Sequence, residues 1–346
     1  MALMKKIEKA LALRILTHIN TNLLSKLLSK KRKHSGKYKT QILIDISVFN
    51  QNDAGTGIQR VVRTIKKVIE LNYINHQLMR DNFSIRFIYA SRKKSYHYLD
   101  NNKKISVEKG DIFFGLDWSA HILTSNFNEI INLKYSGVFF SFILYDMLPA
   151  TNPEWFTKET VQKHSLWLKL ISITADQILC ISNDVKDNLL KHYDNNLFNH
   201  DHIDICTIPL GCDFENYPSE VKFHQNCQLE FIKKPFALVV GTLEPRKGHI
   251  DVIEVFKQLW QEKYELNLIF VGHNGWSNNK ILELIKNTTS EFPENFKHLE
   301  NVNDLELKII YESAKIVICP SLGEGYGLPV IEAMYFNKCI IARNIP

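Results

Sequence analysis

Short apolar segments alternate with amphipathic segments along most of this chain. We expect strands at residues 41–49, 84–90, 111–116, 138–145, 177–181 and 203–209, and helices at 56–71, 158–175 and 183–193. The pattern restarts with strands at 236–241, 266–271 and 315–320 and helices at 247–263, 279–291 and 304–315. Repeated strand–helix units need crossover connections, so an α/β fold is predicted, with mostly parallel sheets and helices on both faces.

The 346 residues suffice for two domains with separate cores. Residues 211–235 interrupt the alternation with polar and charged side chains, so we expect them to connect the domains. The predicted organisation is a basic amphipathic leader (1–40), an N-terminal Rossmann-like domain (41–210), this connection, and a C-terminal Rossmann-like domain (236–346). Since the chain stops soon after the strand-like residues 339–341, the second domain is expected to be incomplete, with a truncated C-terminal end.

The leader holds the basic excess of the chain. Residues 1–39 contain 11 Lys and Arg against one acid, Glu8, which leaves 32 Lys and Arg against 36 Asp and Glu in the rest. Apolar residues recur every four positions from Ile7 to Leu27, and Lys or Arg residues cluster up to Lys33. Such a helix either lies on an anionic membrane surface through residues 1–33 or packs on its own domain. No nucleic-acid partner is expected, because the body of the chain is acidic.

Cysteine usage and hydropathy bear on the compartment. None of the six cysteines forms a Cys-x-x-Cys pair, which favours buried thiols in a reducing compartment. No apolar run approaches the ~20 residues that a membrane-spanning helix needs. We therefore expect a cytoplasmic protein, peripheral on the inner face of the plasma membrane if the leader binds lipid.

Residues 321–332 read Ser-Leu-Gly-Glu-Gly-Tyr-Gly-Leu-Pro-Val-Ile-Glu and follow a short apolar strand. Pro329 is placed where a helix begins, so this stretch links a strand to a helix. Its glycines allow a ligand to approach the backbone, and the helix N-terminus offers free N–H groups to an anion. Glu324 and Glu332 lie at the carboxyl end of the strand, where ligands bind in open α/β sheets.

A second motif, Gly-Thr-Leu-Glu-Pro-Arg-Lys-Gly at residues 241–248, also follows a strand and opens a helix. Positive side chains at a helix N-terminus oppose the macrodipole, and a bound anion would relieve that conflict. Arg246 and Lys247 are therefore candidates to bind a diphosphate, Arg246 with two hydrogen bonds and Lys247 as a compact charge.

The spacing Glu-x7-Glu in Glu-Gly-Tyr-Gly-Leu-Pro-Val-Ile-Glu resembles the donor-binding motif of retaining GT-B-fold glycosyltransferases, specifically glycosyltransferase family 4 (group 1). The resemblance extends over residues 41–346 and is closest to bacterial enzymes that add mannose or related sugars to surface polysaccharides. It implies two Rossmann-like domains with parallel sheets facing a central cleft. It also implies a nucleotide-sugar donor and a glycan or lipid-linked glycan acceptor.

The resemblance assigns roles residue by residue. Glu324 would hold hydroxyls of the donor sugar, Glu332 the ribose, and Arg246 and Lys247 the leaving diphosphate. Asp146, which follows an apolar strand, either orients the acceptor or sugar hydroxyls or caps a turn. The remaining donor-binding residues implied are Gly57 in a loop over the phosphates, Val302 at the nucleotide base, and Gly325, Tyr326, Gly327 and Leu328.

Two positions depart from the family pattern. Tyr145 stands where many relatives have a histidine before the aspartate, and Thr242 where relatives commonly have an arginine. No His, Cys or carboxylate cluster has metal-site spacing, so neither a metal nor another cofactor is predicted.

The predicted function is retaining transfer of a hexosyl unit, mannosyl by resemblance, from a nucleoside diphosphate sugar to a hydroxyl of a growing, lipid-linked bacterial surface glycan. Two alternatives stay open. One is a catalytically impaired nucleotide-sugar-binding or scaffold protein of a glycan assembly complex, and the other is a GT-B phosphorylase.

Overall fold

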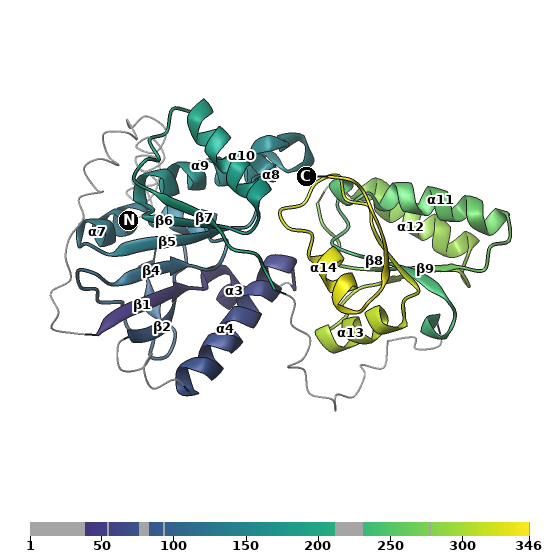
Figure 1. Ribbon diagram of the computed structural model, residues 1–346, viewed down its shortest axis with the longest axis horizontal. Coiled ribbons are helices and arrows are strands. Elements are labelled where there is room, and N and C mark those ends of the chain that lie inside the picture. Colours follow the sequence, from purple (N-terminus) through teal and green to yellow (C-terminus); the bar gives the residue numbers. More distant parts are fainter. Residues whose placement is uncertain are drawn as a thin grey trace. The chain divides into compact units, whose positions relative to one another are not determined.

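The computed structural model describes residues 39–53, 55–75, 83–92, 94–211, 231–276 and 278–345 (Figure 1). The predicted leader helix and most of the predicted interdomain connection therefore lie outside the described residues. The chain divides into two compact units. Unit 1 comprises the chain up to Pro153 together with Lys158–Pro209, and unit 2 comprises Glu154–Thr157 and the chain from Leu210 onward.

Unit 1 is built on a seven-stranded sheet with the strand order β3-β2-β1-β4-β5-β6-β7 (Figure 1). All neighbouring pairs are parallel except β2 with β3. The strands are β1 (Thr40–Asp45), β2 (Phe83–Tyr89), β3 (His97–Tyr98), β4 (Ile112–Gly115), β5 (Phe139–Leu144), β6 (Gln177–Cys180) and β7 (Asp204–Thr207).

Helices connect β1 to β2, β4 to β5, β5 to β6 and β6 to β7, as crossover connections between parallel strands require. The long helix α9 packs against three shorter ones, α6, α7 and α8. The α-helices of unit 1 in the described residues are α3 (Ser47–Gln51), α4 (Gly57–Asn75), α6 (Ala120–Ser125), α7 (Phe127–Tyr135), α8 (Leu148–Thr151), α9 (Lys158–Thr174) and α10 (Asn183–Asn195).

Unit 2 contains a five-stranded sheet in the order β10-β9-β8-β11-β12, with every pair parallel. The strands are β8 (Phe236–Val240), β9 (Asn267–Val271), β10 (Phe296–Leu299), β11 (Ile316–Cys319) and β12 (Cys339–Ala342). Its helices are α11 (His249–Gln261), α12 (Asn279–Glu291), α13 (Asp304–Ser313) and α14 (Leu328–Tyr335), with the 3-10 helices η2 (Phe231–Lys233) and η3 (Pro245–Lys247).

Alternate residues of the central strands of unit 2 enter two different cores. Ala237 and Val239 of β8 pack with α11 and α12, whereas Phe236 and Leu238 pack with α13 and α14. Side chains of a strand alternate between the faces of its sheet, so both faces of this sheet are covered by helices. This explains why β8 and β9 read as continuous apolar runs, and it confirms the predicted α/β architecture.

The structure corrects one sequence expectation and adds elements that the sequence did not predict. The strand expected at 41–49 ends at Asp45, because the Asp45 carboxylate accepts a hydrogen bond from Ser47 N (3.0 Å) and the chain turns into α3. Residues 120–135 form two short helices, α6 and α7, which meet at Asn126. The strand β10 was not expected either, because Lys297 and His298 hide its apolar pattern.

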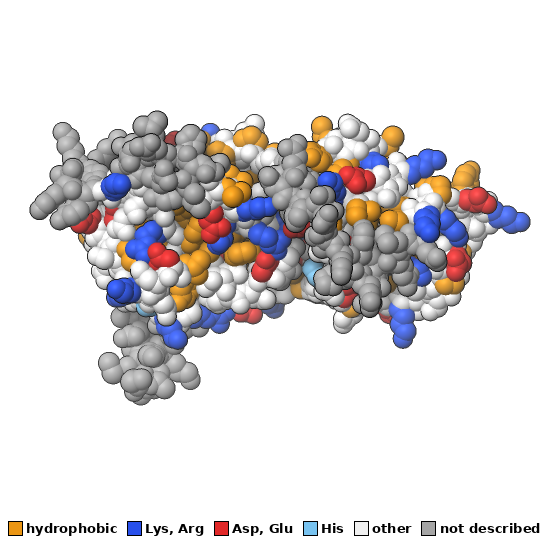
Figure 2. Space-filling model, turned by 90° about the horizontal axis from the view of Figure 1, so that it is seen from below, with side chains coloured by type: hydrophobic (Ala, Val, Ile, Leu, Met, Phe, Trp, Pro, Cys, Tyr) orange, Lys and Arg blue, Asp and Glu red, His pale blue; other side chains and the backbone are white. Residues whose placement is uncertain are grey.

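The face drawn in Figure 2 carries Lys and Arg side chains interspersed with Asp and Glu side chains. Mixed charges of this kind are typical of an ordinary solvated protein surface. Among the described residues, no helix has the length and apolar character that crossing a membrane requires.

Candidate functional site

The two sequence motifs of unit 2 lie at the carboxyl ends of adjacent strands. Residues 241–248 follow β8, residues 320–327 follow β11, and β8 and β11 are hydrogen-bonded neighbours. From β8 the chain continues to β9 and β10 on one side of the sheet, and it returns to β11 on the other side. This is the topological switch point at which open α/β sheets bind ligands. We call residues 320–327 the donor loop.

The donor loop ends at the N-terminus of α14. Gly327 is the N-cap residue and adopts a left-handed conformation (φ 78°), which a glycine accepts without strain. Pro329 follows in the first turn, as the sequence predicts. Pro329 has no N–H group and Val330 N donates to Gly327 O (2.9 Å), so among the first three residues of α14 the N–H of Leu328 is the candidate donor to an anion.

Backbone contacts hold the two motifs together. Leu322 N donates to Arg246 O (2.7 Å). The side chain of Arg343, which lies outside both motifs, donates from Nε to Pro320 O (3.0 Å). Gly248 is left-handed (φ 68°), and a Cβ atom at this position would lie 2.4 Å from Pro320 O. Only a glycine allows this close approach of the two motifs.

The structure brings three predicted site residues together. Lys247 Nζ donates to Glu324 Oε1 (2.5 Å), Arg246 Nη1 lies 3.6 Å from Glu324 Oε2, and Arg246 Nη1 also donates to Gly323 O (3.0 Å). Burial by itself would raise the pKa of Glu324, but Lys247 and Arg246 outweigh it and lower this pKa below its ordinary value. Glu324 is therefore ionised, and it pairs with the cations that are expected to bind a diphosphate.

Glu244 completes this cluster, and sequence reasoning gave it no role. Its Oε2 lies 3.0 Å from Arg246 Nε, and its side chain is 5% exposed. Burial raises the pKa of Glu244, while Arg246 and Lys247 lower it less strongly. In the sequence, its place inside Glu-Pro-Arg-Lys was the only available signal.

Glu332 and Tyr326 make buried contacts away from these cations. The Glu332 side chain lies in the core beneath α14, 3% exposed, and it accepts a hydrogen bond from Tyr311 Oη (2.7 Å). Tyr326 Oη donates to the carbonyl of Leu210. The remaining residues of the predicted set, Gly325 and Leu328, are half-buried in the donor loop and at the start of α14.

Val302 lies in the connection between β10 and α13, where its side chain packs against the core of unit 2. The next residue, Asn303, caps α13. Its side chain accepts from Glu306 N, and the Glu306 carboxylate accepts from Asn303 N (both 2.9 Å). This capping box fixes the backbone around Val302, the part of the chain predicted to contact a nucleotide base.

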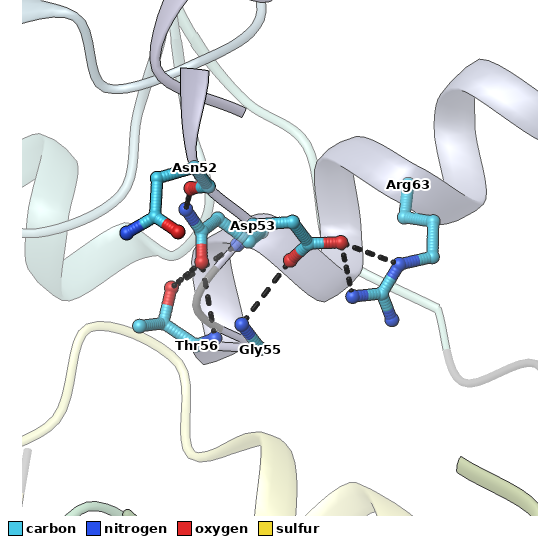
Figure 3. A network of polar contacts seen from close by, with 6 residues as sticks. Asn52, Asp53, Gly55, Thr56 and Arg63 are labelled. Atoms are coloured by element: carbon cyan, nitrogen blue, oxygen red, sulfur yellow. Dashed lines mark hydrogen bonds and ion pairs between the residues drawn. The ribbon is translucent and has the colours of Figure 1, made fainter. Parts of the chain in front are cut away.

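Figure 3 shows the polar network that orders the loop before α4 in unit 1. Arg63 donates to Asp53 Oδ2 through Nε (3.1 Å) and Nη2 (2.5 Å), and Asp53 Oδ1 accepts from Gly55 N (3.1 Å). The side chain of Gln59 donates to Asn52 O (2.6 Å). Gly57, the first residue of α4, is exposed and directly follows the residues of this network.

Asp146 follows β5 and is half-buried, and its backbone is hydrogen-bonded to the imidazole of His164. The preceding Tyr145 is buried, and its hydroxyl donates to Leu116 O (2.7 Å). Tyr145 is therefore a structural side chain.

A buried carboxyl cluster at the switch point of unit 1, between β1 and β4, was not anticipated. Asp45 is fully buried and accepts hydrogen bonds from Ser119 Oγ (2.7 Å) and from the hydroxyl of Ser47. Burial is the largest cause that raises its pKa to about 7. Nearby, Asp117 accepts from Phe49 N (2.6 Å), and burial raises its pKa as well.

Within the described ranges, no group of three or more His, Cys, Asp or Glu side chains is placed to hold a metal ion.

Comparison with known proteins covers the part of the chain that carries the cation–carboxylate cluster. Residues 222–346 match the family described as "Glycosyl transferases group 1". The serotype-specific mannosyltransferase WbdA of Escherichia coli is 28% identical over 322 residues, which are 90% of this chain and 38% of WbdA. Residues 222–346 of this chain are therefore similar to the group 1 glycosyltransferases. It spans about two fifths of the length of that relative.

A further relative and a solved structure are also similar to this chain. The O-antigen chain mannosyltransferase B of Escherichia coli is 28% identical over 206 residues, 58% of this chain and 52% of that protein. The structure of Anabaena HepE in complex with UDP and glucose matches with a TM-score of 0.57 and 14% identity, covering 88% of this chain and 80% of HepE. The predicted GT-B fold is confirmed, and the predicted family resemblance is borne out over residues 222–346.

Proposed function

We propose that this chain transfers a hexosyl unit from a nucleoside diphosphate sugar to a hydroxyl group of a growing glycan, with retention at the anomeric carbon. The observation that carries the proposal is the contact of Lys247 with Glu324 at the switch point of unit 2 (2.5 Å). A cation and a carboxylate placed beside a helix N-terminus provide the chemistry that a sugar diphosphate requires.

The site residues act on opposite ends of the bond that breaks. Negative charge develops on the diphosphate as it leaves the anomeric carbon, and the Lys247 ammonium with the Leu328 amide at the start of α14 stabilises it. When the diphosphate takes Lys247, Glu324 is free to accept hydrogen bonds from sugar hydroxyls. Glu332 is only 3% exposed, so we propose that it supports ribose binding indirectly, by stabilising the backbone around it.

We further propose a mannosyl unit as the group transferred and a lipid-linked surface glycan as the acceptor. The names of two relatives, a serotype-specific mannosyltransferase and an O-antigen chain mannosyltransferase, support this choice. We place the reaction at the inner face of the plasma membrane, with the basic residues 1–33 as the contact to anionic lipid. In unit 1, Asp146 and the loop at Gly57 are the proposed contacts to acceptor and donor.

The test is a panel of nucleotide sugars, UDP-glucose and GDP-mannose among them, with release of nucleoside diphosphate as the readout. We expect release that depends on a glycan acceptor and a product whose anomeric configuration, measured by NMR, equals that of the donor. Lys247→Ala should abolish most of the release, whereas the control Lys280→Ala, at an exposed position on α12, should not. Release that is equal in both variants would refute the assignment of Lys247.

One observation favours a second candidate, a protein that binds nucleotide sugar without turning it over. Tyr145 is buried and bonded to Leu116 O, so its side chain cannot replace the histidine of many relatives at the reacting carbon. Binding of a nucleotide sugar by calorimetry without any acceptor-dependent release would support this candidate. Sugar phosphate formed with inorganic phosphate would instead indicate a phosphorylase.

A further inference from the structure

We propose that Glu244 is a positioning residue that holds the Arg246 guanidinium against the donor loop, so that Lys247 is the cation that exchanges Glu324 for the donor diphosphate. The inference rests on the proposed function for its catalytic consequence. Its structural part, the hold on the donor loop, does not depend on which substrate the chain uses.

Arg246 connects three parts of unit 2. Its Nε lies 3.0 Å from Glu244 Oε2, its Nη1 donates to Gly323 O (3.0 Å), and the same Nη1 lies 3.6 Å from Glu324 Oε2. The Arg246 side chain is only 11% exposed. A guanidinium that already makes these three contacts is better suited to hold two loops together than to bind a ligand from solvent.

The Glu244 side chain lies in space that Gly275 leaves open. A Cβ atom on Gly275 would lie 2.7 Å from Glu244 Cγ and 2.9 Å from Leu243 O. The glycine therefore leaves the space that the Glu244 side chain occupies. Glu244 Oε2 and Arg246 Nε are within ion-pair distance, but neither atom makes an aligned hydrogen bond within the described part of the chain. The attraction between them is therefore mainly electrostatic.

The four charges of the cluster balance one another. Lys247 and Arg246 face Glu324 and Glu244, and Lys247 makes the shorter contact with Glu324 (2.5 Å against 3.6 Å). Without the Glu244 carboxylate, Arg246 keeps Glu324 as its ionic partner in the cluster. We expect Arg246 to shift toward it, to weaken its bond to Gly323 O and to withhold Glu324 from the donor sugar.

The variant Glu244→Gln removes this charge and keeps the shape of the side chain. We expect the amides of residues 320–327 to exchange with solvent about tenfold faster than in the wild type, measured by hydrogen–deuterium exchange and mass spectrometry. The matched control is Glu254→Gln at an exposed position on α11, which should leave the exchange unchanged. Equal exchange in wild type and Glu244→Gln would overturn the proposal.

Activity provides a readout that general destabilisation would not reproduce. We expect Glu244→Gln to lower kcat by about 10- to 100-fold, since small misplacements of reacting groups have effects of this size. Its affinity for UDP, GDP or ADP, measured by calorimetry, should be retained or tightened, because a negative charge beside the diphosphate site has been removed. Loss of diphosphate affinity in proportion to kcat would contradict the positioning role.

The double variant with Arg246→Lys separates this proposal from the proposed function. If Glu244 acts through Arg246, the single and double variants should show the same fast exchange of the donor loop, whereas additive effects would overturn the inference. Arg246→Lys alone should give the same loop exchange even if Glu244→Gln fails to fold. Should the wild type bind none of the three nucleotides, the proposed function fails while the exchange comparison still decides the role of Glu244.

Discussion

The variant Gly248→Ala tests the contact that joins the two motifs of the site. Gly248 has φ 68°, and the methyl group of an alanine there would lie 2.4 Å from Pro320 O, where ordinary contacts begin near 3.4 Å. The left-handed conformation costs a non-glycine residue about 1–2 kcal/mol. The loops must also separate by about 1 Å, and overpacking of this kind costs about 1–3 kcal/mol. We therefore expect unit 2 to be destabilised by about 2–5 kcal/mol.

The clash cannot be relieved by a side-chain rotation. Pro320 O is a backbone atom held by Arg343 Nε (3.0 Å), and the adjacent Leu322 N is bonded to Arg246 O (2.7 Å). Any movement of the donor loop away from an alanine at position 248 would stretch both hydrogen bonds. Destabilisation and loss of site geometry should therefore occur together.

The control is Gly327→Ala, which has the conformational cost without the clash. Gly327 has φ 78°, but a Cβ atom there would meet only Val330 Cγ2, at 3.8 Å, among the described residues. Urea unfolding followed by pulsed hydrogen exchange of β8 and β9 peptides reports unit 2 alone. A difference of about 2 kcal/mol between the variants should separate their midpoints by about 1 M urea. Midpoints that correspond to equal stabilities within about 0.5 kcal/mol would refute the reasoning.

Three further predictions follow from charges and buried contacts. Burial raises the pKa of Asp45 from 3.8 to about 7, so the folded state binds a proton that the unfolded state releases between these pH values. The free energy of unfolding should therefore fall as pH rises from about 4 to 7. In urea titrations Asp45→Asn should lose this pH dependence, and the exposed control Asp187→Asn should keep it. Tyr311→Phe removes the donor to buried Glu332 and should cost about 1.5–3 kcal/mol in thermal unfolding, and an unchanged Tm would contradict the contact. Lys247→Ala should lower kcat while Tm changes little, because the lysine ammonium pairs with Glu324 of the donor loop at the site itself.

The sequence predicted the elements that are buried on both faces. The strands around Leu238 and Ile269 were found because both faces of the sheet are covered, which makes the segments uniformly apolar. The edge strand β10 was missed because Lys297 and His298 interrupt the pattern. The pair α6 and α7 was missed because each helix is short and Asn126 divides the periodicity between them.

The site was predictable only where residue type and spacing carry information. Lys247 and Glu324 are 77 positions apart and meet because β8 and β11 are neighbours, which the placement of both motifs after strands suggested. The roles of Glu244 and Asp45 could not be read in advance. A glutamate or aspartate has the same letter whether it is solvated or buried, and only the packing of distant segments removes water from it.

The short strand β3 determines how one side of the sheet of unit 1 meets its surroundings. It pairs antiparallel with β2 through only Tyr98 and His97, and the Arg86 guanidinium lies over the Tyr98 ring (3.4 Å) while it pairs with Asp100. A long, open edge would offer unpaired N–H and C=O groups to any extended chain nearby. With its two residues, β3 is too short to serve as such a template, so β3 itself offers little edge to which another strand could add.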